Sequence, residues 1–255
     1  NIVEPMEEIT IDGIMSDAGK VSAALMKFGG FPEPFLKQSE KDWRRWHSNR
    51  LERLIKEDIR DLENLRDLSA MQILVDILPS KVGSLLSLNS LREDISVAHK
   101  TIANWMDILE RFYYHFRIYP YAHKKIKSLK KEPKLYLWDW SEINDNDGAR
   151  LENIVASHLL KLCHYLHDVD GYKTDLHFLR DIDGREVDFL VTSDGKPWFA
   201  VEVKSSAKDI SKTLNYFGAK LDIPFLYQVV DERDIDVRQD NVRILSAEKF
   251  LQSLI

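Results

Sequence analysis

The sequence predicts a multidomain chain of mixed α+β and α/β character. Its first part, residues 1–67, carries apolar positions at helical spacing, and residues 68–140 combine short helices with two strand-like runs. The last part, residues 141–255, alternates helices with short apolar, β-branched runs, which is typical of an α/β core. A chain of 255 residues is long enough for two or three small domains.

Composition places the chain among ordinary globular proteins. Hydrophobic residues make up 44% and charged residues 31% of the sequence, and the formal net charge is −6. No apolar run approaches the roughly 20 residues that span a bilayer, and no signal peptide is visible, so we expect a cytoplasmic protein without a membrane partner. Cys163 is the single cysteine, which excludes internal disulfides and a cysteine zinc cluster. The acidic balance argues against wholesale coating of nucleic acid but leaves room for a local basic patch.

The helical segment is expected to contain two helices, at residues 15–28 and 41–67. The glycine- and proline-containing string at residues 29–34 separates them. Trp43 and Trp46 lie one turn apart on the second helix, where they could stack on nucleic-acid bases. Such a pair more often packs in a core, and the sequence leaves both interpretations open.

The sequence pattern of the middle module, residues 68–140, predicts a winged helix-turn-helix. Helices are expected at residues 71–78, 88–95 and 99–112, with Asn89 or Ser90 capping the second, and a tight turn separates the last two. Strand-like runs at 113–121 and 134–138 then flank a lysine-rich loop.

Two roles are open for this module: DNA binding, or service as a spacer or protein-docking unit. If it binds duplex DNA, the exposed positions at the start of the third helix would face the major groove, namely His99, Lys100, Thr101 and Asn104. The loop would contact phosphates through its five lysines, Lys124, Lys125, Lys127, Lys130 and Lys131.

A pair of strands in the last segment carries a candidate catalytic site. A hairpin turning at Asp194-Gly195 would bring Asp188 close to Glu202, because side chains alternate across each strand. Two adjacent carboxylates repel each other unless a cation lies between them, and Mg²⁺ or Mn²⁺ prefers such oxygen ligands. Lys204 would lie beside the metal, where it could orient a water molecule or stabilise negative charge.

Asp188, thirteen further residues and then Glu202-Val203-Lys204 resemble the PD-(D/E)xK nuclease motif. The resemblance implies a restriction-endonuclease-like three-layer α/β core over residues 141–255. It also implies that Glu152, on a preceding helix, supplies a third metal ligand beside Asp188 and Glu202. Glu186 lies on the same strand face as Asp188 and could bind the metal or compete for it. The alternative is a catalytically inactive regulatory or protein-interaction module on a nuclease-like scaffold.

A second resemblance covers about residues 28–206. The string Gly29-Gly30-Phe31-Pro32-Glu33, a tryptophan-rich helix, the winged module and the nuclease-like end occur in the order found after the ATPase module of a prokaryotic group of AAA-plus-like ATPases. This resemblance implies a C-terminal module of a larger ATPase, with the ATPase module upstream of Asn1. The sequence has no Gly-x4-Gly-Lys-Ser/Thr loop to cradle phosphates, so we expect no ATP site in these 255 residues.

Overall fold

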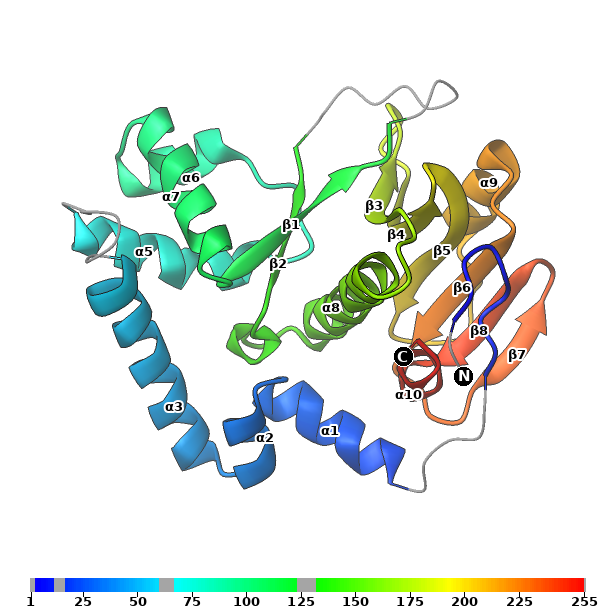
Figure 1. The fold of residues 1–255 in the computed structure, drawn as a ribbon, viewed down its shortest axis with the longest axis horizontal. Helices are drawn as coiled ribbons and strands as arrows, with labels where there is room; N and C mark the ends of the chain where they lie inside the picture. Colours follow the sequence, from blue (N-terminus) through cyan, green and yellow to red (C-terminus); the bar gives the residue numbers. More distant parts are fainter. Residues whose placement is uncertain (1–2, 12–16, 60–66, 123–131, 255) are drawn as a thin grey trace. The chain divides into compact units, whose positions relative to one another are not determined.

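The computed structural model describes residues 3–11, 17–59, 67–122 and 132–254. These residues form two compact units, each built from separate stretches of the chain. Unit 1 contains residues 1–22, 118–133 and 151–255, and unit 2 contains residues 23–117 and 134–150. The mixed α+β character predicted from the sequence is confirmed, because helices precede a mixed sheet (Figure 1). No described helix is both long and apolar enough to cross a membrane.

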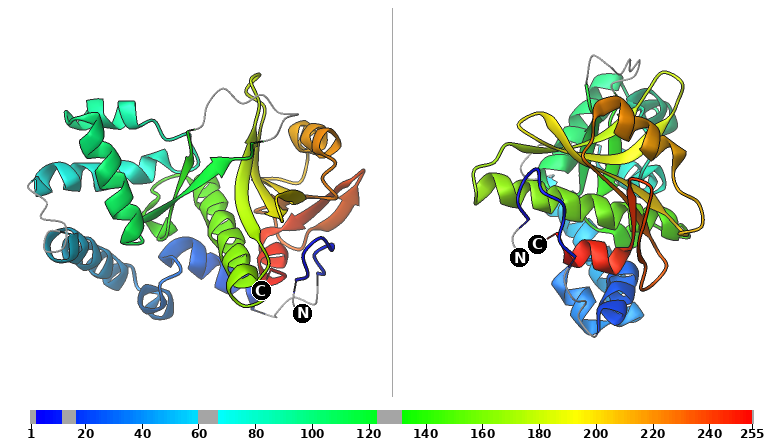
Figure 2. Two further views of the ribbon diagram at one scale, coloured as in Figure 1. Left: turned by 45° about the horizontal axis from the view of Figure 1, so that its top comes forward. Right: turned by 90° about the vertical axis from the view of Figure 1, so that its right-hand side faces the viewer.

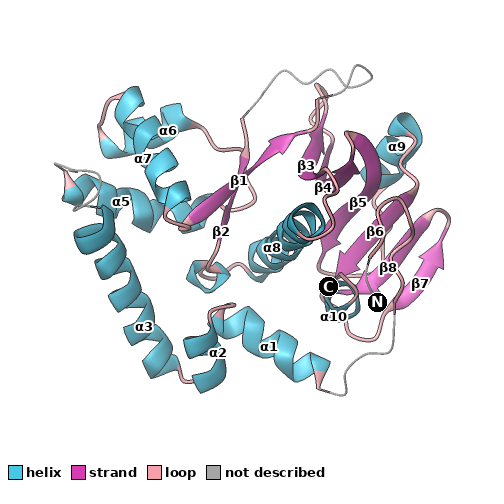
Figure 3. Cartoon of the chain, viewed as in Figure 1, coloured by secondary structure: helices cyan, strands magenta, loops and turns pink. Residues whose placement is uncertain are grey.

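Unit 2 is mainly helical (Figure 3). Helices α1 (Ala18–Phe28), α5 (Leu68–Ile77), α6 (Leu88–Ile95) and α7 (His99–Arg111) lie close to the predicted positions, because apolar spacing and local capping fix them. Helix α2 (Pro32–Lys37) was not predicted, because it occupies part of the string at residues 29–34 that was expected only to separate two helices. Helix α6 begins after Ser87, whose side chain accepts a hydrogen bond from Ser90 N, so the predicted cap at Asn89 or Ser90 was wrong by two or three residues. The elements of unit 2 are α1 (Ala18–Phe28, which begins in unit 1), α2 (Pro32–Lys37), α3 (Glu40–Arg53), a π-helical turn (Leu54–Ile59), α5 (Leu68–Ile77), a 3₁₀ turn (Leu78–Lys81), α6 (Leu88–Ile95), α7 (His99–Arg111), β1 (His115–Pro120, which ends in unit 1), β2 (Lys134–Leu137) and a 3₁₀ turn (Trp140–Glu142).

The glycine pair after α1 allows a close approach within unit 2. Gly29 has a φ of +79°, and a Cβ atom there would lie 2.5 Å from Oδ1 of Asp139. A Cβ at Gly30 would lie 2.6 Å from the ring of Trp140. The string that ends α1 therefore packs against the turn after β2, and both glycines are needed for steric reasons.

Unit 1 is a sheet with helices on both faces. Its strands run in the order β1-β3-β4-β5-β6-β8-β7. Antiparallel pairing joins β3 to β4, β4 to β5 and β7 to β8. Parallel pairing joins β1 to β3, β5 to β6 and β6 to β8. Helices α8 and α9 lie on opposite faces (Figures 1 and 2). The elements are α8 (Asp147–Asp168, which begins in unit 2), β3 (Thr174–Arg180), β4 (Glu186–Ser193), β5 (Lys196–Lys204), α9 (Lys212–Leu221), β6 (Phe225–Val230), β7 (Asp236–Gln239), β8 (Val242–Ser246) and α10 (Ala247–Gln252).

The hydrophobic core between the sheet and α9 determines which strand residues share a face of the sheet with α9. Leu190 of β4, Ala200 of β5 and Leu226 of β6 are buried with Leu214 and Phe217 of α9. Because side chains alternate along a strand, Asp188, Glu202 and Gln228, each two residues from one of these strand positions, lie on the same face of the sheet as α9.

Candidate functional site

The hairpin of β4 and β5 forms as the turn residues predict. Asp194 and Gly195 have φ values of 50° and 73°, the left-handed conformation that tight hairpin turns require. Phe189 pairs with Val201 and Leu190 with Ala200. The same register, continued by one residue, places Asp188 opposite Glu202.

Three of the four predicted active-site side chains converge at the open end of this hairpin. Oδ2 of Asp188 accepts a hydrogen bond from the backbone N–H of Val203 at 2.9 Å. Nζ of Lys204 lies 3.4 Å from Oε1 of Glu202, and 13% of the Glu202 side chain is exposed against 38% for Lys204. The site is therefore half-buried, with the ammonium group on its outer side.

Glu202 is the member of this group whose carboxyl pKa is raised. Burial, and after it the negative charge of Asp188, raises the pKa of its carboxyl to about 7, while Lys204 and a hydrogen bond with Ser211 oppose the shift. Its Oε2 atom is buried and makes no hydrogen bond with any described residue. A buried, unsatisfied carboxylate oxygen beside a second carboxylate is stabilised by a bound cation.

Sequence reasoning missed two residues that support Glu202. Gln228 of β6 is fully buried and lies beside Glu202 in the parallel register of β5 and β6. Its Oε1 accepts a hydrogen bond from Ser211 N at 2.9 Å, and its Nε2 donates to the Asp209 carbonyl at 3.0 Å. Gln228 thus fixes the loop from which Ser211 reaches Glu202 and caps α9. The available signal was a glutamine inside an otherwise apolar strand.

The two other acidic candidates are placed differently. Glu152 is half-buried on α8, the helix on the opposite face of the sheet from α9. Glu186 of β4 forms an ion pair with Arg180 of β3. Among the described side chains, no group of three or more His, Cys, Asp and Glu residues is arranged to hold a metal ion. The role of Glu152 as a third ligand stays a prediction.

The predicted DNA-contacting positions divide into two sets, one on α7 in unit 2 and one in the lysine-rich loop, which belongs to unit 1. His99, Lys100 and Asn104 of α7 are exposed and Thr101 is half-buried, directly after the three-residue turn that begins at Ser96, whose φ is 60°. The opposite face of α7 is buried. The lysine-rich loop, with Lys124, Lys125, Lys127, Lys130 and Lys131, lies outside the described residues.

Unit 2 also contains a buried charged cluster that the sequence did not reveal. The side chains of Asp139 and Glu142 are 1% and 3% exposed. Nη1 of Arg50 lies 3.0 Å from Oε1 of Glu142, and Nε2 of His47 lies 3.4 Å from the same oxygen. The Tyr114 hydroxyl donates to Oε2 of Glu142 at 2.7 Å.

The cluster shifts three pKa values upward, those of Asp139, His47 and Tyr114. Burial, and after it the charge of Glu142, raises the pKa of Asp139 to about 6. Burial opposes protonation of His47, but its 3.4 Å contact with Glu142 and the negative charges of Glu142 and Asp139 outweigh burial and raise its pKa. The cluster therefore binds protons more tightly than its separate members would.

Comparison with known proteins shows similarity to two domain families. Residues 22–144 match the family described as a domain of unknown function, DUF8612, and residues 147–250 match a second domain of unknown function, DUF4143. The chain is 29% identical over 180 residues to the uncharacterized protein MJ1637 of Methanocaldococcus jannaschii, a match that covers 64% of this chain and 36% of that protein. The chain thus spans about a third of the length of this relative. No solved structure matches it significantly.

Proposed function

We propose that this chain is a DNA-binding module that cleaves phosphodiester bonds with the aid of a divalent metal ion, as part of a larger cytoplasmic ATPase. The observation that carries the proposal is the convergence of Asp188, Glu202 and Lys204 at one end of the β4–β5 hairpin. The spacing and strand placement of these residues resemble the PD-(D/E)xK nuclease motif.

The donor set fits Mg²⁺ or Mn²⁺. Asp188 and Glu202 would hold the ion, which supplies positive charge that lowers the pKa of a coordinated water molecule and stabilises negative charge on phosphate. The buried Oε2 of Glu202, which has no hydrogen bond with a described residue, supports this assignment. The Lys204 ammonium lies beside Glu202 and can stabilise the charge that develops on the phosphate oxygens. Gln228 holds the loop from which Ser211 forms a hydrogen bond with Glu202.

Metal binding is tested first. Calorimetric titration with Mn²⁺ should show binding to the wild type that is lost in Glu202→Ala. Equal binding, or none in either protein, would remove the metal site from the proposal.

Cleavage is tested with Mn²⁺ or Mg²⁺ on single-stranded and duplex DNA. Lys204→Ala should lose about 100-fold or more in rate, because a positioned charge at the reacting group is removed. Lys196→Ala, at the opposite end of β5, is the matched control and should cleave like the wild type. Cleavage that survives in Lys204→Ala would refute its role, and no cleavage of any DNA would favour the inactive-scaffold alternative.

DNA binding by unit 2 is supported by α6 and α7, two helices joined by a short turn, with polar exposed residues at the start of α7. If about four phosphates are contacted, the plot of log affinity against log salt should have a slope of roughly −3.6. Replacing the five lysines of the 124–131 loop with glutamine should flatten that slope. A slope that stays the same would remove the loop from the interface.

The ATPase context is argued from the order of features along the chain, which resembles the order found after the ATPase module of AAA-plus-like ATPases. We infer that ATP binds to a partner module and not to these 255 residues, which contain no phosphate-binding loop of the Gly-Lys-Ser/Thr type. Nucleotide titration of this chain should show no ATP binding. Tight ATP binding would overturn this division of roles.

A further inference from the structure

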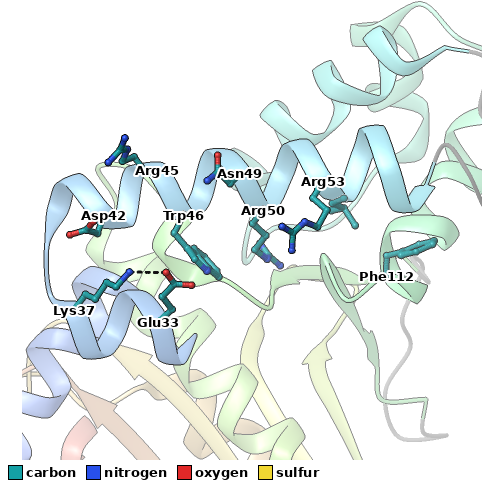
Figure 4. A pocket seen from close by; sticks show the side chains of 10 residues that line it. Glu33, Lys37, Asp42, Arg45, Trp46, Asn49, Arg50, Arg53 and Phe112 are labelled. Atoms are coloured by element: carbon teal, nitrogen blue, oxygen red, sulfur yellow. Dashed lines mark hydrogen bonds and ion pairs between the residues drawn. The ribbon is translucent and has the colours of Figure 1, made fainter.

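Unit 2 contains a polar pocket along helix α3 that the proposed catalytic site does not use. Its volume is about 740 Å³, within the range of ligand pockets. The wall is formed by residues of α2, α3 and the end of α7, as Figure 4 shows. The lining residues are Glu33, Lys37, Asp42, Arg45, Trp46, Asn49, Arg50, Arg53, Leu54 and Phe112.

The pocket is cationic in a chain that is acidic overall. Four basic and two acidic side chains line it, a formal charge of +2, whereas the whole chain carries −6. Lys37 and Glu33 neutralise each other through a 2.8 Å ion pair. Arg45 makes no ion pair with any described residue. Arg53 lies 4.0 Å from Glu57, and both side chains are more than two-thirds exposed, a contact that contributes little. Arg45 and Arg53 are therefore available to an anion.

A third arginine forms a fixed part of the wall. The Arg50 side chain is 18% exposed, and its Nη1 is bound by Glu142. Its guanidinium carbon lies 4.6 Å from the centre of the Phe31 ring and 5.7 Å from the centre of the Trp46 ring. A guanidinium has five N–H donors, so Glu142 leaves several of them for a ligand. Because Arg50 is already held in place, a ligand does not have to order it.

The aromatic part of the wall distinguishes this pocket from a simple basic surface. Trp46 is half-buried, and its ring lies 5.0 Å from that of Phe31. Figure 4 shows Trp46, Arg50 and Arg53 projecting from the same side of α3, with the Glu33–Lys37 pair of α2 facing Trp46. The Asn49 amide adds a further donor to the lining. Arginines combined with an indole match a phosphate backbone that carries aromatic bases.

We propose that this pocket binds a single-stranded segment of nucleic acid, with its phosphates on Arg45 and Arg53 and a base against Trp46. Arg45 and Arg53 lie eight residues apart on α3, about 12 Å along the helix axis, and Figure 4 shows Arg45 projecting from a different side of the helix from Arg53, so the two arginines contact different phosphates. The inference rests on the proposed nucleic-acid function, but it concerns a surface separate from Asp188, Glu202 and Lys204. An acidic protein segment would use the same cations without needing a base-stacking indole.

The test measures binding of a fluorescent 20-nucleotide oligo(dT) to the whole chain by anisotropy. The double variant Arg45→Glu/Arg53→Glu should bind at least about tenfold more weakly, and its salt slope should fall by about 1.4, at about 0.7 per phosphate lost. The matched control, Lys41→Glu/Arg44→Glu, changes the charge of α3 equally at positions outside the pocket and should weaken binding much less. Equal weakening in both double variants would overturn the proposal. Circular dichroism must show the same helical content in all three proteins.

Three further measurements separate the possible failures. Trp46→Ala should weaken binding about tenfold, whereas Trp46→Phe, which keeps an aromatic ring, should retain most of it. Displacement of the oligonucleotide by polyglutamate of equal charge would overturn the nucleic-acid assignment in favour of an acidic protein. Asp188→Asn should bind oligo(dT) like the wild type. If the protein binds oligo(dT) through the pocket but cleaves no DNA, the pocket proposal is supported and the nuclease proposal is not. If the protein cleaves DNA but its oligo(dT) binding does not depend on the pocket residues, the pocket proposal is overturned and the nuclease proposal is not.

Discussion

Replacing Asp139 with asparagine should remove a pH dependence from the stability of unit 2. Asp139 is buried beside Glu142, and its pKa is raised from 3.8 to about 6. An acid with a raised pKa in the folded state stabilises the fold when protonated, so the free energy of unfolding falls as the pH rises from about 4 to about 6. At 1.36 kcal/mol per pKa unit, the loss is about 3 kcal/mol.

The asparagine side chain keeps the local hydrogen bonds while removing the titration. Oδ1 of Asp139 accepts from the backbone N–H and the hydroxyl of Ser141, and an amide oxygen can do the same. His47 also loses stabilising charge as the pH rises, but its raised pKa places that loss above its ordinary value of 6.5. The variant should therefore lose the pH dependence between 4 and 6 and retain a dependence at higher pH.

Urea unfolding followed by tryptophan fluorescence provides the assay. Five of the six tryptophans, Trp43, Trp46, Trp105, Trp138 and Trp140, belong to unit 2, so the signal reports mainly on this unit. The free energy of unfolding of Asp139→Asn relative to wild type should increase by about 3 kcal/mol between pH 4 and pH 7. Asp94→Asn, at an exposed position of α6, is the control and should show a constant difference. A constant difference for Asp139→Asn as well would refute the reasoning.

Three further substitutions test the packing and the site. Gly30→Ala places a Cβ atom 2.6 Å from the buried Trp140 ring and should lower the urea-unfolding free energy of unit 2 by about 2 kcal/mol; an unchanged midpoint would show that the ring moves freely. Tyr114→Phe leaves the buried Glu142 without its 2.7 Å hydrogen bond and should cost about 2 kcal/mol by the same measurement, whereas a cost near zero would mean that another donor replaces it. Gln228→Leu releases the loop that positions Ser211 and should weaken Mn²⁺ binding about tenfold in calorimetry, and unchanged affinity would count against this positioning role.

The sequence predicted the elements that depend on local signals. The Asp194-Gly195 turn and the flanking apolar runs were sufficient to place the β4–β5 hairpin, and hairpin register then brought Asp188 next to Glu202. Helix α7 lies at the position that the sequence predicted, and its apolar side chains, Ile102 and Trp105 among them, are buried. These predictions succeeded because the interactions lie within a few residues or within one hairpin.

Features that depend on distant contacts or lack an apolar pattern were not predicted. Strand β7 is fully exposed and rich in charge, so it has no alternating apolar positions, and it forms by pairing with β8. Trp43 and Trp46 were judged more typical of a core, yet α3 contains no buried residue, and the Trp43 indole N–H donates to the Ser141 hydroxyl. The cluster around Asp139 joins three separate parts of the chain, and no spacing rule identifies it.

Arg50 links the stability of unit 2 to the proposed pocket. Its Nη1 lies 3.0 Å from Oε1 of the buried Glu142 and 3.9 Å from Oδ2 of Asp139. Leaving a buried charge without its partner costs about 3–5 kcal/mol. The stability of the turn that carries Asp139 and Glu142 therefore depends on the position of Arg50 on α3. A nucleic acid bound in the pocket, with its phosphates on Arg45 and Arg53, would add negative charge to the pocket that Arg50 also lines. Binding at the pocket must therefore favour protonation of His47 and Asp139, and protonation of the cluster must favour binding in return.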